Sequence, residues 1–144
     1  DIISLGALAT HAMISGDAII ADAVPALGAL CGAIANARVR AMGTIGGNLC
    51  FAEPRADPPV LLAALDAQLH LISARGERRI PASQFITGAM ETLRAPDELL
   101  LRIEIPVTTG NICYERVVFG HRTIAGAAVV LPNGPAIEPR IWLG

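Results

Sequence analysis

Gly43-Thr44-Ile45-Gly46-Gly47-Asn48 is the stretch of this sequence that needs the most specific explanation. Its adjacent glycines let the backbone approach a ligand closely and reach positive φ at low cost. Successive N–H groups in such a turn form an anion nest suited to a diphosphate, and Thr44 and Asn48 add side-chain donors. The segment is neither the dinucleotide fingerprint G-x-G-x-x-G nor a P-loop. Two interpretations stay open, a diphosphate-binding turn and, more common for a bare Gly-Gly, an ordinary tight turn.

Charged side chains flank this stretch on both sides. Asp57 follows it, and a carboxylate near a diphosphate is better placed facing sugar-alcohol hydroxyls than phosphates. The simpler role for Asp57 is to cap a helix that begins at Pro58 and Pro59. Arg38 and Arg40 precede the stretch and could support phosphate charge, although solvated surface arginines are the commoner outcome.

Composition favours one compact domain and excludes several functions. The 144 residues are 53% hydrophobic, which argues against disorder and is enough for a hydrophobic core. The net charge is -2 and the arginines are scattered, so nucleic acid is not the expected partner. The longest apolar segment, residues 24–35, is interrupted by proline and glycine and is too short to span a membrane. It predicts a buried helix.

The cysteines, histidines and chain ends give expectations for metal sites, cellular location and the extent of the protein. Cys31, Cys50 and Cys113 are widely separated, which predicts no disulfide framework, no iron–sulfur cluster held by this chain alone and a reducing, cytoplasmic location. The three histidines are equally dispersed, so we expect no metal site. The chain starts in an apparent strand without a signal-peptide pattern and stops on an apolar run. We expect both ends to continue in a longer protein.

Hydrophobic periodicity predicts an α+β fold, with helices in the first half and strands in the second. The expected helical segments are 11–15 with Thr10 as N-cap, 24–35, 57–65 and a short turn at 81–85, with a connector at 36–42. The expected strands are 2–8, a hairpin of 68–73 and 77–80 across Arg75-Gly76, 99–105, 113–119, 125–131 and 137–143, with turns at 109–111 and 132–134.

A family resemblance rests on the run Arg40-Ala41-Met42-Gly43-Thr44-Ile45-Gly46-Gly47-Asn48-Leu49-Cys50, followed by Ala52-Glu53-Pro54-Arg55-Ala56-Asp57. It is similar to the signature of the FAD-binding domain of molybdopterin dehydrogenases, the xanthine dehydrogenase and aerobic carbon monoxide dehydrogenase family. Further matches in the same order cover essentially the whole chain, in residues 5–7, 66–67, 75–78, 80–81 and 97–106. Glu53 replaces the usual Asp, and Phe51 stands where some relatives have His.

The resemblance implies a PCMH-type α+β domain, with the second lobe at residues 1–106 and the start of a C-terminal α+β domain at 107–144. Nothing in residues 1–43 matches the family's N-terminal lobe, which supplies a second Gly-rich segment for the diphosphate. These residues alone would then offer half of the diphosphate cradle, and we expect weak or absent FAD binding by them in isolation. Each hydrogen bond to a charged group of this kind contributes on the order of 1.5–3 kcal/mol to binding.

The resemblance also implies the cofactor-binding residues. Thr44, Ile45, Gly46, Gly47 and Asn48 would bind the FAD diphosphate and ribityl region. Asp57 would contact the FAD polyol, and Leu100 would lie beside the isoalloxazine ring. Ile34 matches a position that is aromatic in some relatives, and Arg116 stands where relatives often carry Lys, a substitution that keeps the charge but changes its geometry. No catalytic acid or base is expected, because FAD carries the redox chemistry.

The function implied by the resemblance is that of an FAD-binding electron-transfer subunit of a molybdenum hydroxylase. A large subunit with a molybdenum cofactor would oxidise the substrate, and a small subunit with two [2Fe–2S] clusters would pass electrons to FAD. The acceptor would be NAD, a quinone or oxygen. Two alternatives stay open. One is a flavin-less assembly or interaction module, and the other is a PCMH-type oxidase with covalently bound flavin, which this motif fits poorly. The substrate cannot be read from these residues.

Overall fold

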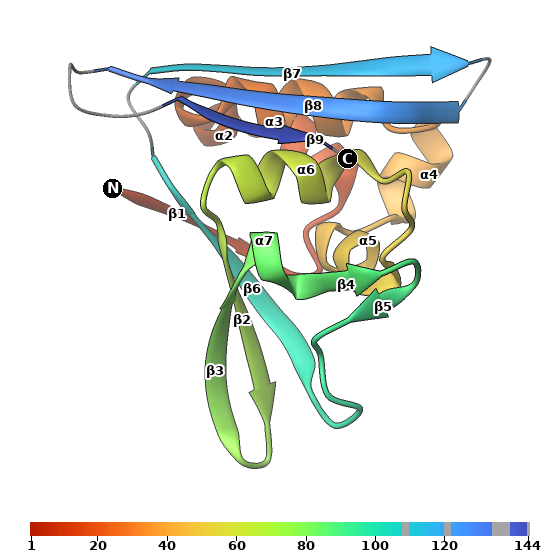
Figure 1. The fold of residues 1–144 in the computed structure, drawn as a ribbon, viewed down its shortest axis with the longest axis vertical. Helices are drawn as coiled ribbons and strands as arrows, with labels where there is room; N and C mark the ends of the chain where they lie inside the picture. Colours follow the sequence, from red (N-terminus) through yellow and green to blue (C-terminus); the bar gives the residue numbers. More distant parts are fainter. Residues whose placement is uncertain (108–109, 120–121, 134–138, 144) are drawn as a thin grey trace.

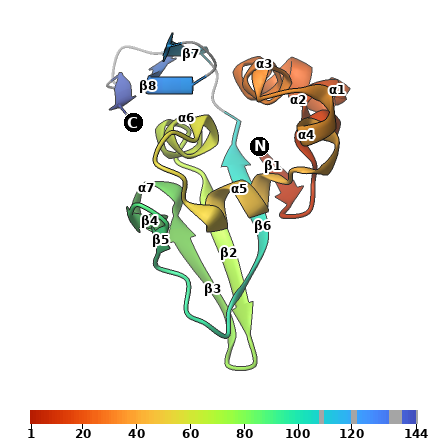
Figure 2. The same ribbon diagram turned by 90° about the vertical axis from the view of Figure 1, so that its right-hand side faces the viewer.

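The structure is a computed structural model that describes residues 1–107, 110–119, 122–133 and 139–143. It places helix α6 (Asp57–Ala64) between two antiparallel sheets (Figure 1). The larger sheet has the strand order β1-β6-β2-β3, and the smaller has the order β7-β8-β9. Helices α1 to α4 lie beside the smaller sheet rather than beneath it (Figure 2). This separation of helices from antiparallel strands confirms the predicted α+β class.

The helices are short and the strands longer toward the C-terminus. The helices are α1 (His11–Gly16), α2 (Ala18–Ala23), α3 (Pro25–Ala33), α4 (Ala37–Met42), α5 (Ile45–Phe51), α6 (Asp57–Ala64) and α7 (Ala82–Phe85). The strands are β1 (Ile2–Gly6), β2 (Gln68–Ser73), β3 (Gly76–Pro81), β4 (Ile86–Gly88), β5 (Glu91–Thr92), β6 (Leu99–Pro106), β7 (Gly110–Phe119), β8 (Arg122–Pro132) and β9 (Arg140–Leu143).

Side-chain caps define where most of the short helices begin. Thr10, Asp17, Asn36 and Thr44 each precede a helix and accept hydrogen bonds from N–H groups of its first turn. Pro25 occupies the first position of α3, where its missing N–H costs nothing. Helices this short are marginal in isolation, so their stability comes mainly from packing.

The core fills the space between α6 and the two sheets. Leu61 and Leu62 of α6, Leu69 of β2, Phe85 of α7 and Ile103 of β6 are fully buried there. Strand β6 alternates buried and partly exposed residues in its second half, which is the pattern of a strand with one face on the core. Its pairing with both β1 and β2 makes β6 the central connection of the larger sheet.

Several predicted elements are confirmed. The hairpin across Arg75-Gly76 pairs β2 with β3, and Gly76 has a φ of 119°, which only glycine adopts easily. The helix capped by Thr10, the helical turn at 82–85 and the strand ending at Pro106 are also present. The predicted helix 24–35 ends earlier, at Ala33, and the predicted strand 2–8 ends at Gly6.

Other predictions were wrong. The connector predicted at 36–42 is helix α4, because Asn36 caps it and the following residues favour helix. Gly110 and Asn111 belong to β7 rather than to a turn, while residues 108–109 lie outside the described residues. Pro132 ends β8, and residues 134–138 also lie outside the described part, so the last strand is described from Arg140. The domain boundary expected between residues 106 and 107 stays a prediction.

Candidate functional site

The glycine-rich segment is the start of a helix rather than a tight turn. Thr44 is the N-cap of α5, with extended backbone angles, and its Oγ1 accepts a 3.0 Å hydrogen bond from the Gly47 N–H. The Ile45 and Gly46 N–H groups donate to the carbonyls of Ala9 and Ala7, both at 2.9 Å. The predicted turn is therefore wrong, and α5 begins where this segment meets the chain that follows β1.

The backbone donors of this segment are already used within the protein. Besides the bonds just described, the Asn48 N–H donates to the Thr44 carbonyl at 3.0 Å. Residues 45–48 thus lack the free N–H groups that the predicted anion nest requires, and that part of the prediction was wrong. Packing explains Gly46 instead, since a Cβ there would lie 2.6 Å from Ala7 Cβ. Contact of these residues with FAD stays a prediction.

Two side-chain atoms beside this segment remain without a partner among the described residues. Asn48 Oδ1 and His11 Nδ1 are both buried and accept or donate no hydrogen bond. His11 lies against the segment because its backbone N–H donates to the Gly43 carbonyl at 3.0 Å. Burial lowers the pKa of the His11 imidazole. Buried polar atoms are normally paired. The Asn48 Oδ1 acceptor is therefore unused among the described residues, and it is buried rather than open to the surface.

A second group of polar contacts surrounds Asp57, where α6, β7 and the end of α3 meet. It is the first residue of α6 rather than its N-cap, because Ala56 holds the cap position. Asp57 Oδ1 accepts a 2.6 Å hydrogen bond from the Tyr114 hydroxyl, and Oδ2 pairs with Arg116 Nη1 at 3.0 Å. The carboxylate is only 7% exposed. Burial, together with the Asp57 carboxylate, raises the pKa of Tyr114 above its ordinary value.

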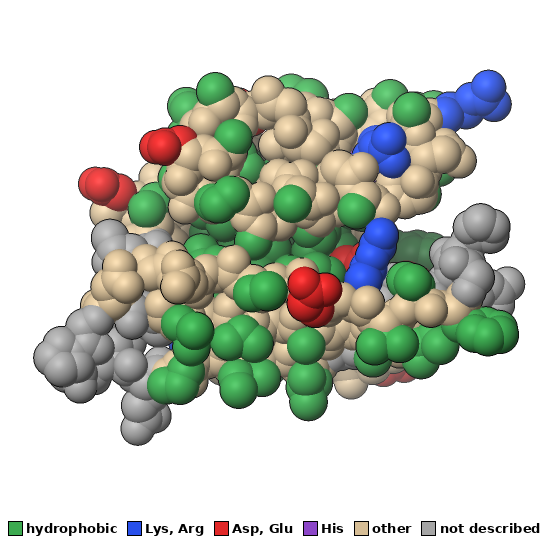
Figure 3. Space-filling model, turned by 90° about the horizontal axis from the view of Figure 1, so that it is seen from above, with side chains coloured by type: hydrophobic (Ala, Val, Ile, Leu, Met, Phe, Trp, Pro, Cys, Tyr) green, Lys and Arg blue, Asp and Glu red, His purple; other side chains and the backbone are tan. Residues whose placement is uncertain are grey.

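This cluster lies in a cleft between α3 and β7. A cavity of about 180 Å³ is bounded by Ala29, Leu30 and Ala33 on α3 and by Tyr114 and Arg116 on β7, with Asp57 between them. Figure 3 shows the furrow from above, between a ridge of helices and the ridge of the smaller sheet, with an acidic and a basic side chain meeting inside it. The small alanine side chains leave the α3 wall flat. The cleft therefore offers an apolar wall opposite a charged one.

The structure brings some predicted site residues together and leaves others apart. Asp57 and Arg116 meet at the cleft. Arg116 Nη2 also donates to the Ala33 carbonyl at 3.2 Å, so Ile34 is the next residue along the chain from a residue that lines the cleft. Thr44 to Asn48 lie on α5. Leu100 is half-buried on β6, whose Leu101 carbonyl accepts from the Ala7 N–H, and Ala7 in turn contacts α5. The predicted residues thus form two groups, one at the cleft and one around α5.

One residue of the cleft, Tyr114, was not predicted, and Arg40 has a different role from the two expected for it. Tyr114 was not singled out, although it alternates with Ile112 and Arg116 on one face of a strand, a pattern that could have indicated it. Arg40 is neither a free phosphate ligand nor a solvated arginine. Its Nη1 donates to the carbonyls of Ile34 at 2.8 Å and Ala35 at 3.2 Å.

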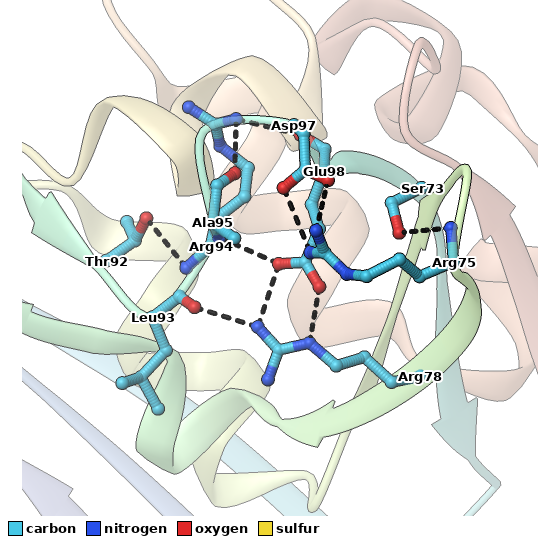
Figure 4. A network of polar contacts seen from close by, with 9 residues as sticks. All are labelled: Ser73, Arg75, Arg78, Thr92, Leu93, Arg94, Ala95, Asp97 and Glu98. Atoms are coloured by element: carbon cyan, nitrogen blue, oxygen red, sulfur yellow. Dashed lines mark hydrogen bonds and ion pairs between the residues drawn. The ribbon is translucent and has the colours of Figure 1, made fainter.

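A polar network fixes the loop that leads into β6 (Figure 4). Glu98 accepts hydrogen bonds from Arg78 Nε at 2.5 Å and Arg78 Nη2 at 2.8 Å, and from the Ala95 N–H at 2.7 Å. Arg78 Nη2 also donates to the Leu93 carbonyl. The Arg78 guanidinium and the Ala95 N–H lower the pKa of Glu98 to about 2. The network therefore fixes the loop directly before β6, the strand that carries Leu100.

Within the part of the chain that the structure describes, no cluster of three or more histidine, cysteine, aspartate or glutamate side chains could hold a metal ion. Among the described residues, no helix combines the length and the apolar character needed to cross a membrane.

Solved structures show the class of protein to which this fold belongs. Carbon monoxide dehydrogenase from Hydrogenophaga pseudoflava contains a chain that superimposes with a TM-score of 0.93 and 29% identity, over 99% of this chain and 52% of that one. Quinoline 2-oxidoreductase from Pseudomonas putida gives a TM-score of 0.91 and 32% identity over the same shares. The PCMH-type α+β fold expected from the sequence is thereby confirmed as that of the medium subunits of such enzymes.

Sequence comparison identifies the family. The profile described as the FAD binding domain in molybdopterin dehydrogenase matches residues 1–108, and the chain belongs to this family. The glyceraldehyde dehydrogenase medium chain of Sulfolobus acidocaldarius is 38% identical over 130 residues, or 90% of this chain and 46% of that one. The carbon monoxide dehydrogenase medium chain of Afipia carboxidovorans is 37% identical over 132 residues, or 88% and 46%. The chain spans about half the length of these relatives.

Proposed function

We propose that this chain forms part of the FAD-binding surface of an electron-transfer subunit in a molybdenum hydroxylase. The observation that carries the proposal is the buried Asp57 carboxylate, which Tyr114 and Arg116 hold at the edge of a cleft in a domain of the FAD-binding family. A buried carboxylate fixed by two partners is a rigid acceptor for hydroxyl groups, and each of its oxygens retains lone-pair capacity beyond its present bond. A sugar-alcohol chain supplies such hydroxyls.

The residues of the site fit an FAD molecule in chemical type. The unpartnered Oδ1 of Asn48 would accept a hydrogen bond from the ribityl region, and Asp57 would accept from the polyol. Leu100 would give apolar contact to the isoalloxazine ring, Ile34 would give a further apolar contact to FAD, and Arg116 would set the charge at the cleft edge. FAD supplies reversible one- and two-electron chemistry when bound. The protein supplies position and electrostatics, so no residue here has to act as an acid or base.

The partners proposed are a large subunit with a molybdenum cofactor and a small subunit with two [2Fe–2S] clusters. The relatives support this, since they are named as medium chains or subunits of dehydrogenases such as that for carbon monoxide. The electron acceptor would be NAD, a quinone or oxygen. We also propose a cytoplasmic location from the dispersed free cysteines, and a domain boundary between residues 106 and 107, where β6 ends before the second sheet begins.

An assembly or interaction module without flavin is the second candidate, and two observations favour it. The N–H groups of residues 45–48 are used within the protein. The outward face of the smaller sheet is apolar and exposed, with Val117 at 62%, Ile141 at 63% and Leu143 at 78% exposure. A face of this kind is typical of a surface that contacts another chain or domain.

One experiment separates the two candidates. The purified chain is mixed with FAD, bound and free flavin are separated by ultrafiltration, and the retained flavin is reduced stepwise while its visible spectrum is recorded. The proposal predicts weak retention of FAD that rises with the concentration of the chain, with a midpoint potential shifted from that of free FAD. Flavin that passes the filter entirely, or retained flavin with the potential of free FAD, would favour the assembly module.

A further inference from the structure

The end of helix α3 forms an unusual turn beside the cleft. The helix ends at Ala33, so its last carbonyls have no partners within the helix. Ile34 follows with extended angles, and Ala35 then adopts a φ of 40°, in the left-handed region. A side chain with a Cβ is rarely found there and persists only where its surroundings hold it. The turn therefore depends on contacts made by other residues.

Arg40 supplies those contacts from one side. Its Nη1 lies 2.8 Å from the Ile34 carbonyl oxygen and 3.2 Å from that of Ala35. Asn36 caps α4 by accepting from the Val39 N–H at 3.1 Å, which fixes the helix that carries Arg40. A cation at the C-terminus of a helix is also favoured by the helix dipole. No carboxylate of the described residues pairs with Arg40, so its polar contacts there are directed at this turn.

Arg116 holds the same turn from the opposite side. Its Nη2 donates to the Ala33 carbonyl at 3.2 Å, while its Nη1 pairs with Asp57 at 3.0 Å. Consecutive carbonyls from Ala33 to Ala35 thus receive donors from two guanidinium groups that come from α4 and β7. The turn links Arg40 to Arg116, and Arg116 links the turn to Asp57.

We infer that Arg40 is a positioning residue of the cleft, which acts through the Ala33–Ala35 turn and Arg116 on the Asp57 carboxylate. Arg40 does not line the cavity, whereas Ala33, Arg116 and Asp57 do. If Arg40 no longer fixed the turn, the Ala33 carbonyl would move away from Arg116, and Arg116 would lose one of its two anchors. The consequence for FAD rests on the proposed function, but the coupling between the two arginines does not.

The coupling is tested without flavin by a double-mutant cycle in the full chain. Unfolding by urea is measured for Arg40→Gln, Arg116→Gln and the double variant. The inference predicts that the double variant loses less stability than the sum of the single losses, because each substitution already weakens the anchor that the other uses. Arg38→Gln is the matched control, since Arg38 lies on the same helix and makes no hydrogen bond or ion pair to the described residues. Its effect should add to that of Arg116→Gln. Additive losses for Arg40 and Arg116 would overturn the inference.

The consequence for the site is tested with FAD. At saturating FAD, the visible circular dichroism of the bound flavin should change in Arg40→Gln and should match that of the unsubstituted chain in Arg38→Gln. The affinity for FAD should fall about tenfold in Arg40→Gln and stay unchanged in Arg38→Gln. Arg40→Lys should restore part of both signals and serves as the variant to use if Arg40→Gln does not fold. Unchanged dichroism and affinity in Arg40→Gln would overturn the positioning role. If the unsubstituted chain binds no FAD, the proposed function fails, and the cycle alone decides whether Arg40 positions Arg116.

Discussion

The Tyr114 hydroxyl donates a 2.6 Å hydrogen bond to Asp57 Oδ1 and so joins the middle of β7 to the first residue of α6. The phenol passes directly over Gly126 of β8, where no Cβ could be accommodated. The smaller sheet is thus fastened to the rest of the molecule at the same carboxylate that the family resemblance assigns to the FAD polyol. Asp57 therefore contributes both to the attachment of the sheet, together with core residues such as Ala128 and Val130 of β8, and to the geometry of the proposed flavin site.

Removal of the Tyr114 hydroxyl should weaken this connection. Tyr114→Phe keeps the ring packing but removes the donor, so Asp57 retains only Arg116. We expect a loss of about 1.5–3 kcal/mol in the free energy of unfolding, the range for hydrogen bonds to charged groups. Urea unfolding followed by the fluorescence of Trp142 measures it. A loss below about 0.5 kcal/mol would show that the bond contributes little in solution.

Asp57→Asn should lower the pKa of Tyr114. Burial raises this pKa first, and the hydrogen bond and negative charge of Asp57 raise it further. The substitution removes the charge and leaves burial, so the pKa should fall while staying above the ordinary value. Tyr114 is the sole tyrosine of the chain, so alkaline absorbance titration reports it alone. Asp22→Asn, at an exposed residue of α2, should leave the midpoint unchanged, and an equal midpoint in Asp57→Asn would contradict the contact.

Gly46→Ala should destabilise the start of α5. The added Cβ would lie 2.6 Å from Ala7 Cβ and 2.7 Å from the Ala7 carbonyl oxygen, so the backbone at Ala7 would have to move. Overpacking of this kind costs about 1–3 kcal/mol. Gly16→Ala is the matched control, because no atom lies within 4 Å of its added Cβ. Thermal or urea unfolding compares the two variants, and equal stabilities would show that α5 does not pack on Ala7 as described.

Stability should fall in acid as the Glu98 network is lost. Arg78 and the Ala95 N–H lower the pKa of Glu98 to about 2, so the folded state favours the carboxylate. That contribution is fully present above the ordinary glutamate pKa of about 4.3 and is lost as the pH falls from there toward 2. Glu98→Gln should therefore flatten the dependence of unfolding free energy on pH in this window. Asp97→Asn, whose exposed pair with Arg75 lies in the same loop, should flatten it far less. Equal slopes in Glu98→Gln and the unsubstituted chain would contradict the network.

Local signals in the sequence were sufficient for the β2–β3 hairpin and for the end of β6, but not for β4, β5 or the start of β7. The hairpin at Gly76 combines alternating apolar residues with the one residue type that accepts its φ, and Pro106 ends β6 as expected. The start of α5 could not be predicted in this way. Paired glycines are poor helix formers, and helix forms there because Thr44 caps it and the Ala7 and Ala9 carbonyls accept its first N–H groups. Those carbonyls are distant in sequence.

The site was predictable only in part, and for a similar reason. Family resemblance indicated Asp57 and Arg116, which the structure brings within 3.0 Å of each other. Tyr114 was not predicted for the site, and Arg40 was expected only to support phosphate charge or to be solvated, because their observed roles depend on tertiary contacts with Asp57 and with the end of α3. Alternation along β7 indicates which face Tyr114 occupies, but neither contact partner can be read from the sequence.

The affinity of the chain for FAD tests the central proposal most directly. Flavin fluorescence is followed as FAD is titrated against the unsubstituted chain, Asp57→Asn and the control Asp22→Asn. The proposal predicts saturable but weak binding, because the backbone N–H groups of residues 45–48 are already used. Asp57→Asn should weaken it by roughly 10- to 100-fold, the equivalent of one charged hydrogen bond, and Asp22→Asn should not change it. No saturable binding by the unsubstituted chain, or equal affinity in Asp57→Asn, would contradict the proposal.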